Sequence, residues 1–233
     1  MLAAWKTGVS RRQGCSPSET VVSRTRVLLA DDHTLITAAL RKLLEGEFEV
    51  VGSVEDGRAL LNAAIDLRAD VVVLDIGLPL LNGLDAGQQL RERHPEIKIV
   101  YLTQNRDPNL AAEAFRRKAS GYLLKNSAVS ELSLAIREAV RGRSYVSPII
   151  AKGMMECMLN RGPGGEGLPG LTPRQREVLQ LLAEGKSMKE VAAILNITTR
   201  TVEFHKYRIM ELLSLKTNAE LVQYAVRQGI VST

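Results

Sequence analysis

Two hydrophobic patterns alternate regularly along residues 25–143 of this 233-residue chain. Continuous apolar runs rich in β-branched residues are separated by stretches with apolar residues at helical spacing, such as Leu132, Ile136 and Val140. The apolar runs are Val27–Ala30, Val50–Val54, Val71–Leu74, Ile97–Leu102 and Gly121–Leu124. Strands that are apolar on both faces are typical of a parallel sheet with helices on both sides. The sequence therefore predicts an α/β domain with a five-stranded, doubly wound parallel sheet.

The sequence on either side of this region has a different character. Residues 1–24 show no periodicity and are rich in Ser, Arg and Thr, so we expect a disordered leader. Residues 144–170 combine a helical segment, Pro148 to Leu159, with a Gly/Pro-rich hinge and are predicted to form a linker. From residue 171 to 233 the pattern is wholly helical, which predicts a small all-α domain.

Composition narrows the classes of protein to consider. No apolar run approaches the roughly 20 residues that span a bilayer, and no apolar segment follows Arg11 and Arg12 as a secretory signal requires. Cys15 and Cys157 are isolated and there are only three histidines, so we expect no zinc cluster and a reducing cytoplasm. Residues 144–233 hold eleven basic and eight acidic side chains, an excess that permits nucleic-acid binding without proving it.

Reactive side chains stand where the predicted strands end. They are Asp31, Asp32, Asp75, Thr103 and Lys125. In an open α/β sheet the carboxyl ends of the strands share one edge, where ligands bind. A single acid there is usually a loop residue or a helix N-cap, but three carboxylates together repel one another unless a hard cation lies among them. Carboxylates with phosphate oxygens and water are the ligands that Mg²⁺ prefers.

The residue types also indicate a reaction. One carboxylate of the three can attack a phosphoryl group and form an acyl phosphate. The ammonium group of Lys125 and the hydroxyl of Thr103 are suited to hold the phosphoryl oxygens, because positioning and electrostatics dominate such transfers. The sequence therefore predicts a phosphoryl-accepting site with Mg²⁺ at this edge of the sheet.

Four separated stretches, "VLLADDHTL", "VVVLDIGLPLLNG", "IVYLT" and "GYLLK", resemble a two-component receiver domain in order and spacing. The resemblance implies a flavodoxin-like fold over residues 25–143 and a sensor histidine kinase as phosphodonor. It implies the following roles: Asp75 as phosphoacceptor, Asp31, Asp32, Asp75 and the Gly77 backbone as Mg²⁺ ligands, Thr103 and Lys125 as phosphate contacts, and Tyr122 as switch aromatic. Pro79 and Gly83 match the loop after the acceptor strand. Gln104 is bulkier than is usual beside the threonine, and Asn126 replaces a frequent proline.

The second domain begins with a clear helix start. Thr172 is the expected N-cap, Pro173 suits the first helical position, and Gln175 has capping-box spacing. Gly185 is expected to end this helix. A second helix is predicted over Met188–Leu195, a third from Thr198 or Thr199 to about Leu213, and a fourth from "TNAE" to before Gly229. Helix, short turn and helix is the geometry of a helix-turn-helix module.

The third of these helices has two faces. Its core positions are predicted to be Val202, Ile209, Leu212 and Leu213, and the polar residues Arg200, Glu203, Lys206, Tyr207 and Arg208 are left to face outward. Taken alone, such a polar face is more often that of an ordinary helical bundle in water. In a DNA-binding protein, Glu can accept from cytosine, whereas Lys and Arg can hold guanine or phosphates.

The stretch "LTPRQREVLQLLAEGKSMKEVAAILNITTRTVEFHKYRIMELLSLKTNAEL" resembles the LuxR-type DNA-binding domain over its whole length. With the receiver, the chain resembles a NarL/FixJ-type response regulator. The resemblance implies DNA contacts from Thr198, Thr199, Arg200, Glu203, Phe204, Lys206, Tyr207, Lys216 and Thr217. Leu212 and Ser214 stand where relatives commonly carry Lys and Gly, so we expect weaker non-specific affinity and, if position 214 is left-handed, a strain of roughly 1 kcal/mol.

The prediction is a cytoplasmic DNA-binding transcriptional regulator, controlled by phosphorylation of Asp75 and homodimeric on double-stranded DNA when phosphorylated. Apart from the self-catalysed transfer to Asp75, we expect no enzymatic activity and no membrane partner. One alternative is a haloacid-dehalogenase-like phosphatase, but such an enzyme needs an acid at the position of Gly77. The other is a degenerate receiver that only binds proteins, which Gln104 keeps open.

Overall fold

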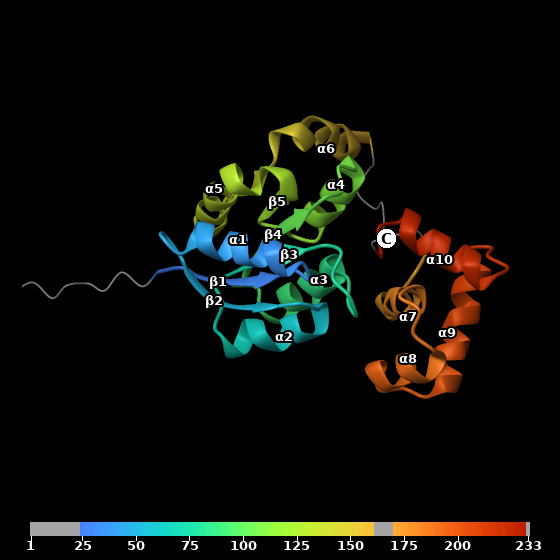
Figure 1. The fold of residues 1–233 in the computed structure, drawn as a ribbon. Helices are drawn as coiled ribbons and strands as arrows, with labels where there is room; N and C mark the ends of the chain where they lie inside the picture. The colour runs from blue at the N-terminus through green and yellow to red at the C-terminus, as the bar shows by residue number, and fades with distance from the viewer. Residues whose placement is uncertain (1–23, 161–169, 232–233) are drawn as a thin grey trace, which may run out of the picture.

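The computed structural model describes residues 24–160 and 170–231, an α/β unit followed by a helical unit (Figure 1). The sheet of the first unit is entirely parallel, in the order β2-β1-β3-β4-β5-β6. Its strands are β1 (Arg26–Ala30), β2 (Glu49–Val54), β3 (Val71–Asp75), β4 (Lys98–Thr103), β5 (Gly121–Leu124) and β6 (Tyr145–Val146). The strand order reverses between β1 and β3, which places the expected ligand site at their carboxyl ends.

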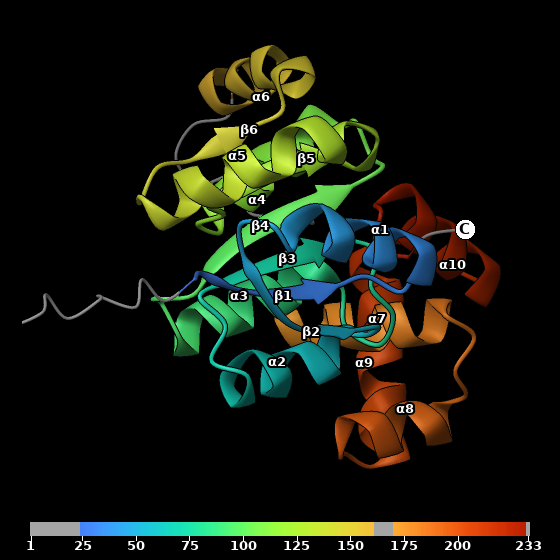
Figure 2. The same cartoon turned by 60° about the vertical axis from the view of Figure 1, so that its left-hand side comes forward.

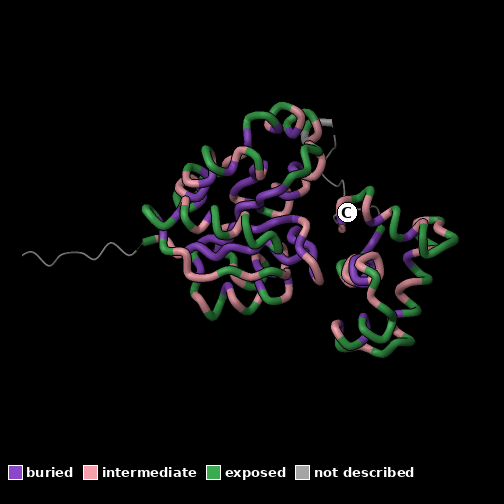
Figure 3. The backbone as a smooth tube through the Cα atoms, viewed as in Figure 1, coloured by how far each residue is buried: buried purple, intermediate pink, exposed green. Residues whose placement is uncertain are grey.

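Helices cover both faces of the sheet (Figures 2 and 3). They are α1 (Thr34–Leu44), α2 (Gly57–Asp66), α3 (Gly83–Arg93), α4 (Pro108–Arg116) and α5 (Ala128–Val140). The inward residues of α1 and α5 form one apolar cluster with the sheet, and those of α2, α3 and α4 form the other. Every residue of β3 is buried, which explains why this strand is apolar throughout until Asp75. The predicted doubly wound α/β class is confirmed.

The sheet has one strand more than predicted. β6 consists of two residues, Tyr145 and Val146, which pair with Gly121 and Tyr122 of β5. A pair of residues is too short to show a strand periodicity, so only the long-range pairing reveals it. The next helix, α6 (Pro148–Asn160), packs against α4 and contributes Ile150 to the core cluster on that face. Both elements follow residue 143, where the receiver was predicted to end.

The helical unit comprises α7 (Pro173–Ala183), α8 (Met188–Leu195), α9 (Thr199–Leu212) and α10 (Asn218–Arg227). The predicted capping box of Thr172 and Gln175 is confirmed, and Ser187 and Glu190 form a second one at the start of α8. These caps satisfy backbone N–H groups that have no partner within their own helix. Gly185 has a φ of +82° and lies just past α7, as expected for a residue that ends a helix.

Two predicted segments fall largely outside the described residues. They are the leader, of which only Arg24 is described, and the Gly/Pro-rich hinge at 161–170, of which only Gly170 is described. Within 24–160 and 170–231, no helix has the length and apolar character needed to cross a bilayer.

Candidate functional site

Three acidic side chains meet at the carboxyl ends of β1 and β3. Carboxylate oxygens of Asp31, Asp32 and Asp75 and a ring nitrogen of His33 all lie within 4.8 Å of one another. The two strands are neighbours in the sheet, so residues that end them are brought together although 44 positions separate Asp31 from Asp75. Asp31 and Asp75 are buried, whereas Asp32 and His33 are exposed. The cluster therefore has two buried acids below an open, polar rim.

Lys125 supplies the positive charge next to the buried acids. It follows β5 directly, and its Nζ lies 2.8 Å from an oxygen of Asp31 and 2.8 Å from an oxygen of Asp75. Burial lowers the pKa of Lys125, but the two carboxylates outweigh this and raise it, so the ammonium form is held. Burial raises the pKa of Asp75, and Lys125 together with a hydrogen bond from the Gly77 backbone offsets this only in part.

The charges of this cluster fit a divalent cation. Three carboxylates with one ammonium group leave an excess of negative charge, and oxygen ligands in this number suit Mg²⁺. The turn after β3 places Gly77 beside the cluster. His33 was missed in the sequence; its Nδ1 lies 3.0 Å from Asp31 and 2.8 Å from Asp32, and its position directly after the two acids was the available signal.

Thr103 and Tyr122 both contact the segment after β4. The Thr103 hydroxyl accepts a hydrogen bond from the Asn105 backbone N–H at 3.1 Å, and the Tyr122 hydroxyl donates to the Asn105 carbonyl at 3.4 Å. Tyr122 is fully buried in β5, and burial raises the pKa of its phenol. Gln104 is exposed. Asn105 was not singled out in the sequence, and it links the predicted hydroxyl contact to the predicted switch aromatic.

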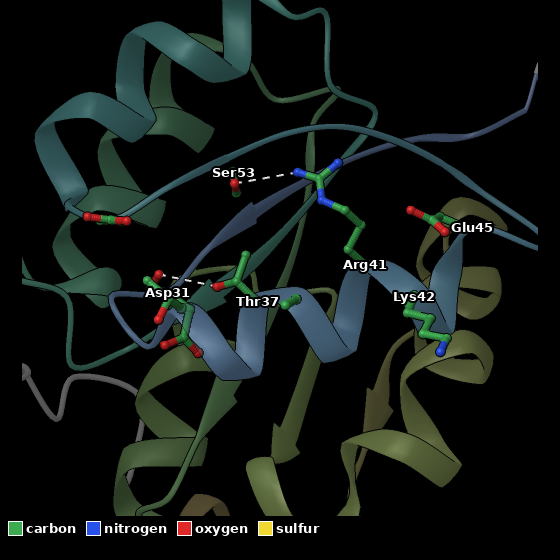
Figure 4. Close-up of a pocket in the computed structure, with 9 residues that line it drawn as sticks. Asp31, Thr37, Arg41, Lys42, Glu45 and Ser53 are labelled. Carbon is green, nitrogen blue, oxygen red and sulfur yellow. Dashed lines mark hydrogen bonds between the residues drawn. The ribbon is translucent and has the colours of Figure 1, made fainter.

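A groove opens beside the acid cluster along α1 and β2 (Figure 4). The Thr37 hydroxyl donates to the backbone carbonyl of Asp31 at 3.4 Å, and Arg41 extends to the Ser53 hydroxyl at 3.5 Å. Its walls carry both basic and acidic side chains, such as Lys42 and Glu45. Asp31 thus borders this groove, although its own side chain is buried.

The helix-turn-helix lies in α8 and α9. Asn196, with a left-handed φ of +52°, ends α8, and the Thr198 hydroxyl accepts from the Thr201 backbone N–H to begin α9. All but one of the residues implicated in DNA binding are exposed, Lys206 being half-buried. The exposed ones are Thr198, Thr199, Arg200, Glu203, Phe204, Tyr207, Lys216 and Thr217.

The outer face of α9 includes two uncovered aromatic side chains. Phe204 is 65% exposed and Tyr207 is 60% exposed, one turn further along the helix. The Lys206 ammonium lies 5.9 Å from the centre of the Tyr207 ring. Apolar side chains on a helix that enters the major groove contact the methyl groups of thymines.

One predicted core position of α9 is wrong. Val202 and Ile209 are buried and Leu213 packs against the core, but Leu212 is 42% exposed. At about 100° per residue, Leu212 is rotated roughly 60° from Ile209, whereas Leu213 is rotated roughly 40° to the other side, where Val202 lies. The helix therefore turns Leu212 toward solvent.

The comparisons with known proteins agree with this arrangement. Residues 27–137 match the response regulator receiver domain, and residues 169–225 match the luxR family of bacterial regulatory proteins. The chain is 33% identical over 211 residues to the transcriptional regulatory protein MctR of Rhizobium johnstonii, covering 90% of this chain and 96% of MctR. It is 30% identical to the response regulator GacA of Pseudomonas aeruginosa, covering 88% of this chain and 97% of GacA.

Solved structures of RcsB are similar as well. RcsB of Salmonella typhimurium matches with a TM-score of 0.62 at 27% identity, covering 88% of this chain and 98% of RcsB. A structure of RcsB from Salmonella enterica serovar Typhimurium, bound to promoter rprA in the presence of phosphomimetic BeF₃⁻, matches with a TM-score of 0.54 at 28% identity, covering 86% and 97%. On these matches and on its two domains, the chain belongs to the NarL/FixJ-type response regulators of two-component systems, with a receiver domain followed by a LuxR-type helix-turn-helix domain.

Proposed function

We propose that the chain is a phosphorylation-controlled transcriptional regulator that acts in the cytoplasm. The observation that carries the proposal is the cluster of Asp31, Asp32 and Asp75 around the Lys125 ammonium group at one edge of the sheet. A buried carboxylate beside a fixed cation, with further acids to hold a metal, is suited to accept a phosphoryl group. A hydrolytic site of the usual kinds would need several histidines or a serine nucleophile, and the described residues of this cluster include one histidine and no serine.

In the proposed reaction, a carboxylate oxygen of Asp75 attacks the phosphorus of a phosphohistidine on a sensor kinase. The new O–P bond forms as the P–N bond breaks, and the histidine nitrogen takes up a proton. Lys125, whose Nζ lies 2.8 Å from Asp75, and Thr103 would contact the phosphoryl oxygens, and Asp31, Asp32 and the Gly77 backbone would hold Mg²⁺. Bound Mg²⁺ supplies neutralisation of the charge on those oxygens.

The readout is DNA binding by α9. Thr103 and Tyr122 both form hydrogen bonds with the Asn105 backbone. Movement of the Thr103 hydroxyl toward a phosphoryl group would therefore shift Asn105 and, with it, the Tyr122 ring. We propose that this change favours a homodimer, whose two α9 helices enter successive major grooves of a double-stranded site. The relative RcsB has been solved bound to promoter rprA in the presence of phosphomimetic BeF₃⁻, which supports a link between phosphorylation and DNA binding.

The test is intact-mass spectrometry of the full chain with acetyl phosphate, with and without Mg²⁺. We expect one phosphoryl adduct that requires Mg²⁺, is absent in Asp75→Ala and is retained in the control Asp66→Ala, an exposed acid on α2. An adduct that persists in Asp75→Ala would show that the nucleophile is another residue. Absence of an adduct on the native chain, with acetyl phosphate and with a cognate kinase, would favour a degenerate receiver.

DNA binding is tested by selection from a random duplex library with the phosphorylated chain. We expect enrichment of paired half-sites, which is lost in Phe204→Ala. In Lys216→Ala we expect weaker binding with the same sequence preference, because the resemblance implies that Lys216 contacts the DNA backbone and such a contact carries little sequence information. Replacing the thymines of a selected site by deoxyuridine removes only their methyl groups, and we expect this to weaken binding of the native chain. Unchanged affinity would contradict thymine contacts by Phe204 and Tyr207.

A further inference from the structure

The receiver and the DNA-binding domain are joined by a polar stripe on α7. Arg176, Gln180 and Glu184 follow one another at four-residue spacing, so they share one face of the helix. This face contacts the loop at residues 76–82, which runs from β3 to α3, and the start of α3. The contacts therefore reach the segment that directly follows Asp75.

Gln180 is the centre of this contact. Its side chain is 1% exposed. Its Oε1 accepts from the Asn82 backbone N–H at 2.6 Å, and its Nε2 donates to the Leu78 carbonyl at 2.9 Å and to Glu184 at 2.7 Å. One amide group thus binds a donor and an acceptor of the loop backbone, which fixes both its orientation and the spacing of the two residues.

Glu184 holds the middle of the same loop. Its carboxylate accepts from the Leu80 backbone N–H at 3.0 and 3.3 Å. Leu80 has a left-handed φ of +64°, which costs a non-glycine residue roughly 1 kcal/mol. Its side chain packs against the apolar core of the DNA-binding domain. The strained backbone of Leu80 is therefore supported from the other domain.

Two further interactions join the domains at the end of the loop that leads into α3. The Asn82 side chain donates to the Ile230 carbonyl at 3.2 Å, beyond the end of α10. Asp85, buried at the start of α3, accepts from Arg176 of the DNA-binding domain at 2.9 Å and from Arg117 of its own domain at 2.7 Å. Three residues of the loop, Leu78, Leu80 and Asn82, are thus bound by groups more than 90 residues later in the chain.

The loop is also part of the proposed phosphoacceptor site. Gly77 lies between Asp75 and Leu78, and its backbone bonds to the Asp75 carboxylate. The loop closes on itself through the Gly83 N–H, which donates to the Ile76 carbonyl at 2.9 Å. The Gln180 bond to Leu78 is thus one residue from the expected backbone ligand of the metal.

We propose that Gln180 is a positioning residue for the Mg²⁺ and phosphoryl site of the receiver, although it belongs to the DNA-binding domain. Docked on the loop, its amide holds the backbone around Gly77 in the arrangement that the acid cluster needs. The inference rests on the proposed function of Asp75. It requires that Mg²⁺ binds more tightly to the docked chain and that, by linkage, Mg²⁺ strengthens docking.

The test is a Mg²⁺ titration of the ¹⁵N-labelled full chain followed by NMR, with native protein and Gln180→Ala. We expect the dissociation constant for Mg²⁺ to rise about two- to tenfold, the range that loss of a hydrogen bond or two produces. The matched control is Gln223→Ala, an exposed glutamine of α10, which should leave the constant unchanged. Cross-peaks of α7–α10 report in the same spectra whether the second domain stays folded.

A second variant, Glu184→Ala, removes the acceptor of the Leu80 N–H and should weaken Mg²⁺ binding in the same direction. The double variant should do little more than either single one, because all three release the same loop. If both single variants keep the native dissociation constant for Mg²⁺, the proposal is wrong. This holds even where one of the variants disturbs the fold of the DNA-binding domain.

Phosphorylation kinetics separate positioning from a direct role. With acetyl phosphate, Gln180→Ala should need more Mg²⁺ for half-maximal rate yet approach the native rate at saturation. A lowered plateau with unchanged Mg²⁺ dependence would overturn the proposal. Native protein that shows no saturable Mg²⁺ binding would instead refute the proposed function of the acid cluster itself.

Discussion

Asp75 is held at an electrostatic cost. Burial raises its pKa above the ordinary 3.8, although the Lys125 Nζ lies 2.8 Å away. The folded protein therefore binds a proton at Asp75 more tightly than the unfolded chain does. The free energy of unfolding falls as the pH rises from the unfolded pKa through the folded one, and stays lowered above that.

Asp75→Asn should remove this loss. In chelator at pH 7.5, we expect the variant to be more stable than the native chain by on the order of 1 kcal/mol, with the difference shrinking toward pH 4. Urea unfolding at several pH values measures it, with Asp66→Asn as the exposed control. A variant less stable than the native chain at pH 7.5 would mean that the pair with Lys125 outweighs the burial cost.

Gly83 lies so close to the Asp75 backbone that there is no room for a side chain. A Cβ at this position would lie 2.1 Å from the Asp75 carbonyl oxygen, closer than any real contact allows. We expect Gly83→Ala to lower the free energy of unfolding by about 1 to 3 kcal/mol, since backbone has to move. Thermal unfolding measures this, and Gly46→Ala, where a Cβ meets nothing within 4 Å, should stay close to native.

At the scale of elements, the end of α9 carries a second strained backbone. Ser214 has a φ of +55°, so the left-handed conformation that glycine would accommodate is present. Ser214→Gly should raise the free energy of unfolding of the DNA-binding domain by about 1 kcal/mol. Ser214→Ala keeps the strain and is the control. Equal stability of the two variants would show that the turn is not strained.

Local signals predicted the helices of the second domain well. Thr172 and Gln175 indicated the start of α7, because a capping box depends on residues that are neighbours in sequence. The predicted bounds of α8, Met188–Leu195, are also those observed. β6 was missed because two residues carry no periodicity and gain their structure from β5. The acid cluster could be foreseen because each of its aspartates ends a strand, and parallel strands bring their ends together.

At the scale of the whole molecule, the contact between the domains could not be foreseen. Gln180 lies on a helix whose polar residues ordinarily face water, and its partners are backbone groups about 100 positions earlier. Backbone groups are the same in every residue, so the amino-acid sequence gives no sign that Gln180 contacts Leu78 or Asn82. The same holds for Leu80, whose side chain completes the core of the other domain.

Docking should depend on pH through Glu184. Burial raises its pKa, opposed in part by hydrogen bonds from Gln180 and the Leu80 backbone. The docked state therefore binds the proton more tightly, and docking strengthens as the pH falls from 7.5 through the raised pKa. Small-angle X-ray scattering of the full chain should show a smaller radius of gyration at pH 5 than at 7.5.

Glu184→Gln should abolish the difference in radius of gyration between pH 5 and pH 7.5. The control Glu156→Gln, at an exposed acid on α6, should retain it. If Glu184→Gln shows the native pH response, another titratable group between the two domains causes the pH dependence of docking.

The docked arrangement leaves the outer face of α9 uncovered, with Phe204 and Tyr207 exposed to solvent. In the proposed function, a single copy can therefore contact DNA before phosphorylation, and phosphorylation controls the pairing of two copies. Promoter occupancy would then rise with the square of the regulator's concentration at low levels. Under the proposed regulation, the number of copies in the cell is a second input beside the sensor kinase, and a modest rise in expression would substitute for part of the signal.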